Sequence, residues 1–160
     1  MRSALILDRT VDALVEQSTS ISLSQDYEDA IVAPLEEDLS VPAVSDVKGF
    51  LSSHALAVYN PQWFCCRFVG PHTDSVGYPY TLGMVVRGGG MLFTGNGRNV
   101  GLLSPGKVYV LDNTKLHGLK SVDGFEPMVF AAMDFLAENF AAAKRLAEDA
   151  VEALSGRISV

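Results

Sequence analysis

The stretch that decides the fold is residues 80–111, YTLGMVVRGGGMLFTGNGRNVGLLSPGKVYVL. It contains four short runs of strand-forming residues, and glycine, proline or asparagine separates each run from the next. The GNGRN segment (95–99) contains Asn-Gly, the favoured two-residue hairpin turn, and SPG (104–106) is a second turn. Two further runs, WFCCRFV (63–69) and PMVFAAM (127–133), flank this stretch. Several short strands at this spacing predict a β-sandwich or barrel.

Residues 1–56 differ from this core, and we interpret them as a helical and irregular N-terminal arm. The SDVKGFLSSHAL segment predicts a short helix, with Ser45, its first residue, as the N-cap. Before it, an acidic segment is interrupted by Pro34 and Pro42, which predicts irregular backbone. The arm is expected to lead into a mainly β core at 57–134, with helices on its flanks.

Residues 135–156 predict a C-terminal helix that packs outside the sheet. An apolar stripe follows one side of this helix, and charged residues of opposite sign, spaced one turn apart, follow the other side. The stripe contains Leu136, Phe140, Ala143, Ala147, Val151 and Leu154. Gly156 is a natural end for the helix. Because the stripe is narrow and rich in alanine, it also fits a helix–helix contact between two subunits, which would make a homodimer.

Length and charge limit the organisation and the partners of the protein. The chain has 160 residues, which fits one domain (1–160), and its net charge of −7 at pH 7 disfavours nucleic acid as a partner. No apolar run approaches the roughly 20 residues of a membrane span, and the short apolar start does not resemble a signal peptide. We therefore expect a cytoplasmic protein without a membrane partner. The adjacent Cys65 and Cys66 are interpreted as reduced, buried packing residues.

His72 and Asp74 form a His-x-Asp pair, and alternation along a strand places both side chains on one face. His117 follows several predicted strands later, and a jelly roll would place it beside the pair at the mouth of the barrel. Two imidazoles and one carboxylate form the facial triad of non-haem Fe(II) oxygenases, although such ligands also suit other divalent metals. The alternative interpretation is that all three are hydrogen-bonded polar residues at strand ends. The third histidine, His54, is expected near the surface.

Three segments resemble the superfamily of cupins and Fe(II)/2-oxoglutarate-dependent dioxygenases, whose fold is the double-stranded β-helix, or jelly roll. GKVYVLDNTKLH (106–117) is similar to the second cupin motif, with its glycine before a strand and its histidine after the following turn. CRFVGPHTDS (66–75) and HGLKSVDGFE (117–126) resemble the prolyl-hydroxylase-type pattern around its His-x-Asp and its distal histidine. The chain departs from the first cupin motif, which has a second histidine where Asp74 stands. The resemblance covers about residues 63–134.

This resemblance implies a jelly roll over 57–134, with Fe(II), or another divalent metal, held by His72, Asp74 and His117. It also implies 2-oxoglutarate as co-substrate and hydroxylation of a small-molecule or peptide substrate.

The dioxygenases hold the far carboxylate of 2-oxoglutarate with an arginine or lysine soon after the distal histidine. The corresponding positions here, 126–128, are Glu-Pro-Met, and the glutamate would repel that carboxylate. Another cation must then replace it, and Arg87 is the first candidate because a guanidinium grips a carboxylate with two hydrogen bonds. Lys120 and Arg67 are the next candidates. The alternative role for Arg87 is a residue at a hairpin edge, since RGGG is typical of a turn.

Two tyrosines follow the His-x-Asp pair and could line the co-substrate pocket through their hydroxyl groups, or else pack in the core. They are Tyr78 and Tyr80. Three functions therefore stay open for the chain. The first is an Fe(II)/2-oxoglutarate-dependent oxygenase, and the second is a cupin-type metalloenzyme whose substrate binds the metal without 2-oxoglutarate. The third is a non-catalytic jelly-roll binding protein.

Overall fold

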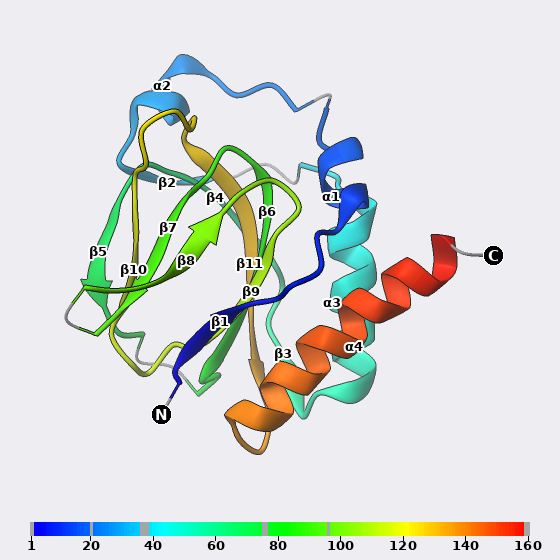
Figure 1. Cartoon of the computed structure of the whole chain (residues 1–160). Coiled ribbons are helices and arrows are strands. Elements are labelled where there is room, and N and C mark those ends of the chain that lie inside the picture. Colours follow the sequence, from blue (N-terminus) through cyan, green and yellow to red (C-terminus); the bar gives the residue numbers. More distant parts are fainter. Residues whose placement is uncertain (1, 20, 36–38, 75–76, 96, 159–160) are drawn as a thin grey trace.

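The computed structural model describes residues 2–19, 21–35, 39–74, 77–95 and 97–158. Within these residues the strands form one seven-stranded and one four-stranded antiparallel sheet, and Figure 1 shows α3 and α4 together on one side of the larger sheet. The helices are α1 (Asp12–Glu16), α2 (Gln25–Asp29), α3 (Pro42–His54) and α4 (Phe140–Ile158). The strands are β1 (Ala4–Ile6), β2 (Val32–Leu35), β3 (Ala57–Val58), β4 (Gln62–Cys66), β5 (Val69–His72), β6 (Tyr80–Arg87), β7 (Gly90–Thr94), β8 (Arg98–Leu103), β9 (Val108–Asp112), β10 (His117–Lys120) and β11 (Met128–Leu136).

The two sheets contain strands from distant parts of the chain. In the described residues, the larger sheet has the order β1-β9-β6-β11-β4-β2, with β3 also paired to β11, and the smaller has the order β5-β10-β7-β8. The predicted hairpin of β7 and β8 is present, although Asn96 of its Asn-Gly turn lies outside the described residues. Among the helices described, none combines the length and the apolar composition needed to cross a bilayer.

β11 runs through the centre of the larger sheet and contributes to two separate cores. Side chains on one face of the strand pack with the helices: Val129, Ala131, Met133 and Phe135. Side chains on the other face point between the two sheets, where Met128 and Phe130 are buried. β6 and β9 alternate in the same way, because successive side chains of a strand point to opposite faces. The larger sheet therefore has a helix side and an inner side, and only the inner side can contribute to a site between the sheets.

The two cysteines follow this alternation. Both are buried free thiols; Cys65 packs on the helix side of β4, and Cys66 packs on its inner side. Burial raises the pKa of the Cys66 thiol to about 12. These contacts agree with a packing role for both residues.

The C-terminal helix packs outside the sheet, as predicted, but it is shifted along the chain. β11 keeps its sheet pairing through Leu136, which lies opposite Ala57 of β3, so residues 135–136 belong to the sheet. The helix begins at Phe140, after Asn139 accepts a hydrogen bond from the backbone N–H of Ala142 through its side chain (2.9 Å), which is a typical N-cap contact. It continues past Gly156 to Ile158, because a helix tolerates an interior glycine at modest cost.

The alanine-rich stripe of α4 is buried within the chain. Ala143 and Ala147 are 0% exposed, and Val151 and Leu154 are buried with them in the helix-side core, which α3 shares. The stripe therefore cannot face a second subunit while the helix is packed in this way. A homodimer through the C-terminal helix stays a prediction, and its contact would have to use residues of α4 outside this stripe.

The N-terminal arm is more regular than predicted. β1 pairs with β9 and β2 pairs with β4, so the arm supplies both edge strands of the larger sheet. Pro34 fits into β2 because an edge strand has backbone N–H groups that need no partner. The expected N-cap at Ser45 is wrong: α3 begins at Pro42, where proline is favoured because the first helical N–H needs no acceptor. The next N–H, that of Ala43, donates to the Gln17 side chain (2.7 Å).

Candidate metal centre

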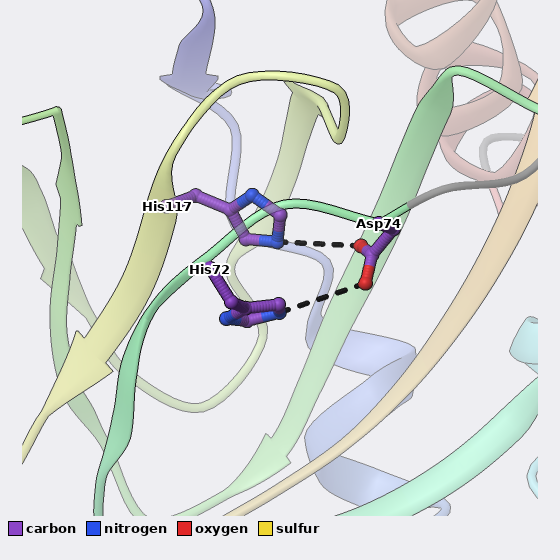
Figure 2. A group of neighbouring side chains, drawn as sticks. All are labelled: His72, Asp74 and His117. Atoms are coloured by element: carbon purple, nitrogen blue, oxygen red, sulfur yellow. Dashed lines mark ion pairs between the residues drawn. The ribbon is translucent and has the colours of Figure 1, made fainter.

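The His-x-Asp pair and a histidine distant from it in sequence meet at the end of the smaller sheet. His72 is the last residue of β5, His117 is the first residue of β10, and the two lie opposite each other in the antiparallel register. Asp74 lies two residues beyond β5. Its Oδ1 is 3.7 Å from Nε2 of His72, and its Oδ2 is 3.5 Å from Nε2 of His117 (Figure 2). Each carboxylate oxygen thus faces one imidazole.

The backbone fixes which nitrogen of each imidazole carries the hydrogen. Nδ1 of His72 lies 2.9 Å from the carbonyl oxygen of Gly70, and Nδ1 of His117 lies 2.8 Å from that of Lys115. A carbonyl oxygen only accepts, so each Nδ1–H donates and each Nε2 of a neutral ring keeps its lone pair. Two lone pairs therefore face a carboxylate, an arrangement of acceptors that a cation between them would stabilise. Metal-bound histidines usually have this second hydrogen bond to a carbonyl or carboxylate.

The spacing and burial of the three side chains fit one metal ion. Their potential ligand atoms all lie within 4.8 Å of one another. Ligands at about 2.1 Å from a metal and at right angles lie about 3 Å apart. The two imidazole–carboxylate pairs here, at 3.5 and 3.7 Å, would each have to close by less than about 1 Å. His117 is 11% exposed, whereas His72 and Asp74 are 41% and 39% exposed, so one side of the cluster remains open. Burial lowers the pKa of His117, which keeps its Nε2 free of a proton at neutral pH.

Asn113 holds the loop that carries Asp74, and the sequence alone did not reveal this role. Its carbonyl oxygen accepts the backbone N–H of Asp74 (2.8 Å). Its fully buried side chain donates to the carbonyl of Tyr78 (2.7 Å) and to Oγ1 of Thr81 (3.1 Å). Asn113 therefore connects the β9–β10 turn to both ends of the segment between β5 and β6. The Asn-Thr dipeptide in DNTKLH indicates a turn, but it does not indicate which residues Asn113 bonds to.

The three side chains border a cavity of about 530 Å³ between the two sheets. Most of its wall is apolar or aromatic, and the aromatic residues are Tyr59, Phe64, Tyr78, Tyr109 and Phe130. Thr81 and Asp134, which are cross-strand neighbours on β6 and β11, add a polar patch. The Thr81 hydroxyl donates to Asp134 (2.6 Å). Sequence reasoning missed this pair, although an aspartate within the apolar run PMVFAAMDF was a usable signal.

None of the three cations proposed to hold 2-oxoglutarate lines this cavity, as far as the described residues go. Arg87 forms ion pairs with Glu28 (3.2 Å) and Glu126 (3.4 Å), and Arg67 donates to the carbonyl of Glu28 (2.9 Å). Both arginines border a different, smaller cavity of about 220 Å³. Lys120 donates to Asn99 (3.1 Å) and its Nζ lies 4.9 Å from the centre of the Phe93 ring.

Strand geometry explains why Arg87 and Tyr80 do not meet the triad. Arg87 is at the far end of β6 from Thr81, and six residues of strand span about 20 Å. Tyr80 precedes Thr81 by one residue, so it faces the helix side, where its ring packs near Phe135 and Phe140. Tyr78, by contrast, borders the cavity. His54 is exposed at the end of α3, as expected.

The comparisons with known proteins support the fold. No protein-family model and no curated protein sequence matches the chain. EctD from S. alaskensis, solved with 2-oxoglutarate and 5-hydroxyectoine, is 12% identical over 84% of this chain and 72% of that chain, with a TM-score of 0.52. A cupin 2 domain-containing protein from Halorhodospira halophila is 15% identical over 98% and 97% of the two chains, with a TM-score of 0.46. The two facing sheets and the outer helix confirm the predicted jelly roll, and the likeness to EctD supports this fold.

Gly118 tests whether the pairing of β5 and β10 sets the geometry of the triad. A Cβ atom at this position would lie 2.4 Å from the carbonyl oxygen of Val69 and 2.5 Å from the Phe93 ring. Gly118→Ala should therefore push β5 away from β10, lowering the free energy of unfolding by about 1–3 kcal/mol. Because His72 would move away from His117, Zn(II) affinity should fall about tenfold. Substitutions that disturb the orientation of metal ligands typically have an effect of this size.

Urea denaturation and calorimetric Zn(II) titration measure the two effects of this substitution. Gly77→Ala is the matched control, since a Cβ atom there meets no atom within 4 Å. Unchanged Zn(II) affinity in a destabilised Gly118→Ala protein would show that strand pairing does not position the triad.

Proposed function

We propose that the protein is a mononuclear metalloenzyme in which His72, Asp74 and His117 hold a divalent metal at the mouth of an apolar cavity. The observation that carries this proposal is the convergence of two Nε2 lone pairs and a carboxylate, with both Nδ1 atoms fixed by backbone carbonyls. Fe(II) is the metal we favour, because two imidazoles and one carboxylate would leave open positions at which bound Fe(II) would activate dioxygen. The reaction class is then oxidation of a bound organic substrate.

The remaining residues of the site would bind and orient that substrate. The aromatic wall excludes water and offers contact to an apolar body, and few polar groups are available to fix its orientation. Asn113 keeps Asp74 in place through the backbone hydrogen bond described above. In this form of the proposal the apolar substrate binds the metal directly. It corresponds to the cupin-type metalloenzyme that needs no 2-oxoglutarate.

The competing form of this proposal uses 2-oxoglutarate as co-substrate, and the order His-x-Asp then histidine favours it. The cavity offers it no anchor, since no lysine or arginine of the described part of the chain lines the wall. A distal carboxylate would lie in an apolar pocket that already contains Asp134. Burying an unpaired carboxylate costs several kcal/mol, so orders of magnitude of affinity would be lost. We therefore favour direct binding of the substrate to the metal.

Anaerobic spectroscopy separates the two forms. The Fe(II)-loaded protein should show no visible charge-transfer band from a chelated keto acid with 2-oxoglutarate at about 1 mM, a concentration that corresponds to weak binding. Elemental analysis checks that the site is full, and nitric oxide, whose iron complex has a characteristic EPR signal, checks that an open position exists. A saturable 2-oxoglutarate band would instead establish the dioxygenase form, and Arg87→Ala would then show whether that arginine contributes.

A further inference from the structure

Asp134 is the one charged group of the inner cavity wall that the proposed metal site does not use, as far as the described residues go. It reaches the wall because β11 alternates, so that Phe130, Ala132 and Asp134 share one face of the strand. The Thr81 hydroxyl donates to its Oδ1 (2.6 Å), and the buried Asn113 amide donates in turn to Thr81 (3.1 Å). Two consecutive hydrogen bonds therefore hold this carboxylate in place beside the cavity.

The carboxylate lacks a positive partner in the described part of the chain. The cavity wall contains no lysine or arginine there, and Nε2 of each imidazole lies beside Asp74. A partly buried carboxylate without a counter-ion loses hydration, and the hydrogen bond from Thr81 replaces only part of it. Burial accordingly raises the pKa of Asp134, although the hydrogen bond from Thr81 offsets part of this effect. A positively charged group of a ligand would supply the missing partner.

The rest of the wall is also suited to a cation on an apolar body. Tyr59 and Tyr78 meet edge to face, with ring centres 4.7 Å apart, and Phe64 and Phe130 stack with centres 5.4 Å apart. Tyr109 completes the wall and lies so close to Gly83 that a Cβ atom there would be 2.0 Å from its ring. Aromatic faces attract cations and also bury hydrocarbon.

We infer that the substrate is an amine with a mainly apolar, aromatic-sized body, and that its ammonium group pairs with Asp134 while another part reaches the metal. This inference rests on the proposed function, since it assigns the substrate class of the same cavity. It is also consistent with the absence of an anchoring cation among the described wall residues, because an anionic group beside Asp134 would meet no lysine or arginine that compensates its charge.

Calorimetric titration of Zn(II)-loaded protein with two probes of the same skeleton tests the inference. The probes are 2-phenylethylamine, which is positively charged, and 2-phenylethanol, which is neutral. The amine should bind at least about tenfold more tightly than the alcohol, which corresponds to about 1.4 kcal/mol. Asp134→Asn should remove this preference and leave the affinity for the alcohol unchanged. Thr81→Val, which removes the hydrogen bond to Asp134, should reduce the preference without abolishing it.

Asp123→Asn is the matched control, because Asp123 is an exposed carboxylate that does not line the cavity. Equal affinity for amine and alcohol in the parent protein, or an unchanged preference in folded Asp134→Asn, would overturn the inference. If Asp134→Asn does not fold, an unchanged preference of Thr81→Val for the amine over the alcohol would likewise overturn the inference. Metal content is measured separately. A full metal site without amine preference refutes only the substrate class, whereas loss of Zn(II) from the parent protein during dialysis refutes the proposed function.

Discussion

Replacing His117 with alanine should lower the affinity for Zn(II), Mn(II) and Fe(II) by more than about 100-fold. Removing a residue that only hydrogen-bonds a metal ligand already costs about 10–100-fold in affinity, and removing the ligand itself costs more. His117 is the most buried of the three side chains, and its Nε2 lies 3.5 Å from Asp74. Without it, the remaining imidazole and carboxylate are both about 40% exposed, so water would compete for the metal. Competition titration with a chromophoric chelator measures the affinities.

His54→Ala is the matched control for this experiment. His54 lies at the end of α3, where its ring stacks on Phe50 and its Nδ1 contacts the Phe50 carbonyl (2.9 Å). It should therefore change metal affinity by less than about twofold, which is less than 0.5 kcal/mol. If His72→Ala/Asp74→Ala/His117→Ala still bound one metal per chain, the site would lie elsewhere and the non-catalytic binding protein would become the better interpretation.

Ala147→Glu should lower the free energy of unfolding by roughly 3 kcal/mol or more, since it places an unpaired carboxylate inside a packed core. Ala147 is 0% exposed, and it belongs to the core that α4 shares with α3 and the helix side of the larger sheet. The added atoms would also overpack this core. Urea denaturation followed by circular dichroism measures the loss of stability, and light scattering measures the mass of the native protein.

Ala141→Glu introduces the same side chain on the exposed face of the same helix, so its effect should stay within about 0.5 kcal/mol. The comparison distinguishes a core contact from a contact between subunits. A native Ala147→Glu protein of parent-like stability and half the parent mass would mean that the stripe joins two subunits.

Local patterns in the sequence were sufficient for the central strands, and jelly-roll topology was needed to predict that the triad residues meet. The turn glycines and the short apolar runs predicted the central strands. β5, β6, β7, β8, β9 and β10 lie within the predicted core, and β11 begins there and extends two residues beyond it. His72 and His117 meet because one ends a strand and the other begins its antiparallel neighbour. Jelly-roll topology made that expectation possible before the structure was known. That they bind metal together with Asp74 stays a prediction.

The remaining features depend on tertiary contacts that sequence spacing does not encode. Arg87 is near Asp74 along the chain, but β6 carries it to the other end of the sheet, where Glu28 and Glu126 neutralise it. Tyr80 differs from the cavity residue Thr81 by one position, and alternation places it on the opposite face. β1 and β2 are three and four residues long, too short for a recognisable period. Their pairing partners, rather than their own sequences, determine that they are strands.

The division of β11 between two faces has a consequence for how this protein can evolve. Residues 129, 131, 133 and 135 maintain the helix-side core, whereas 130, 132 and 134 shape the wall of the cavity. Because substitutions that do not share partners act nearly independently, selection can alter the second set without disturbing the first. Related chains should then diverge in what they recognise long before they diverge in architecture. Among such related chains, conserved and variable positions should therefore alternate along β11.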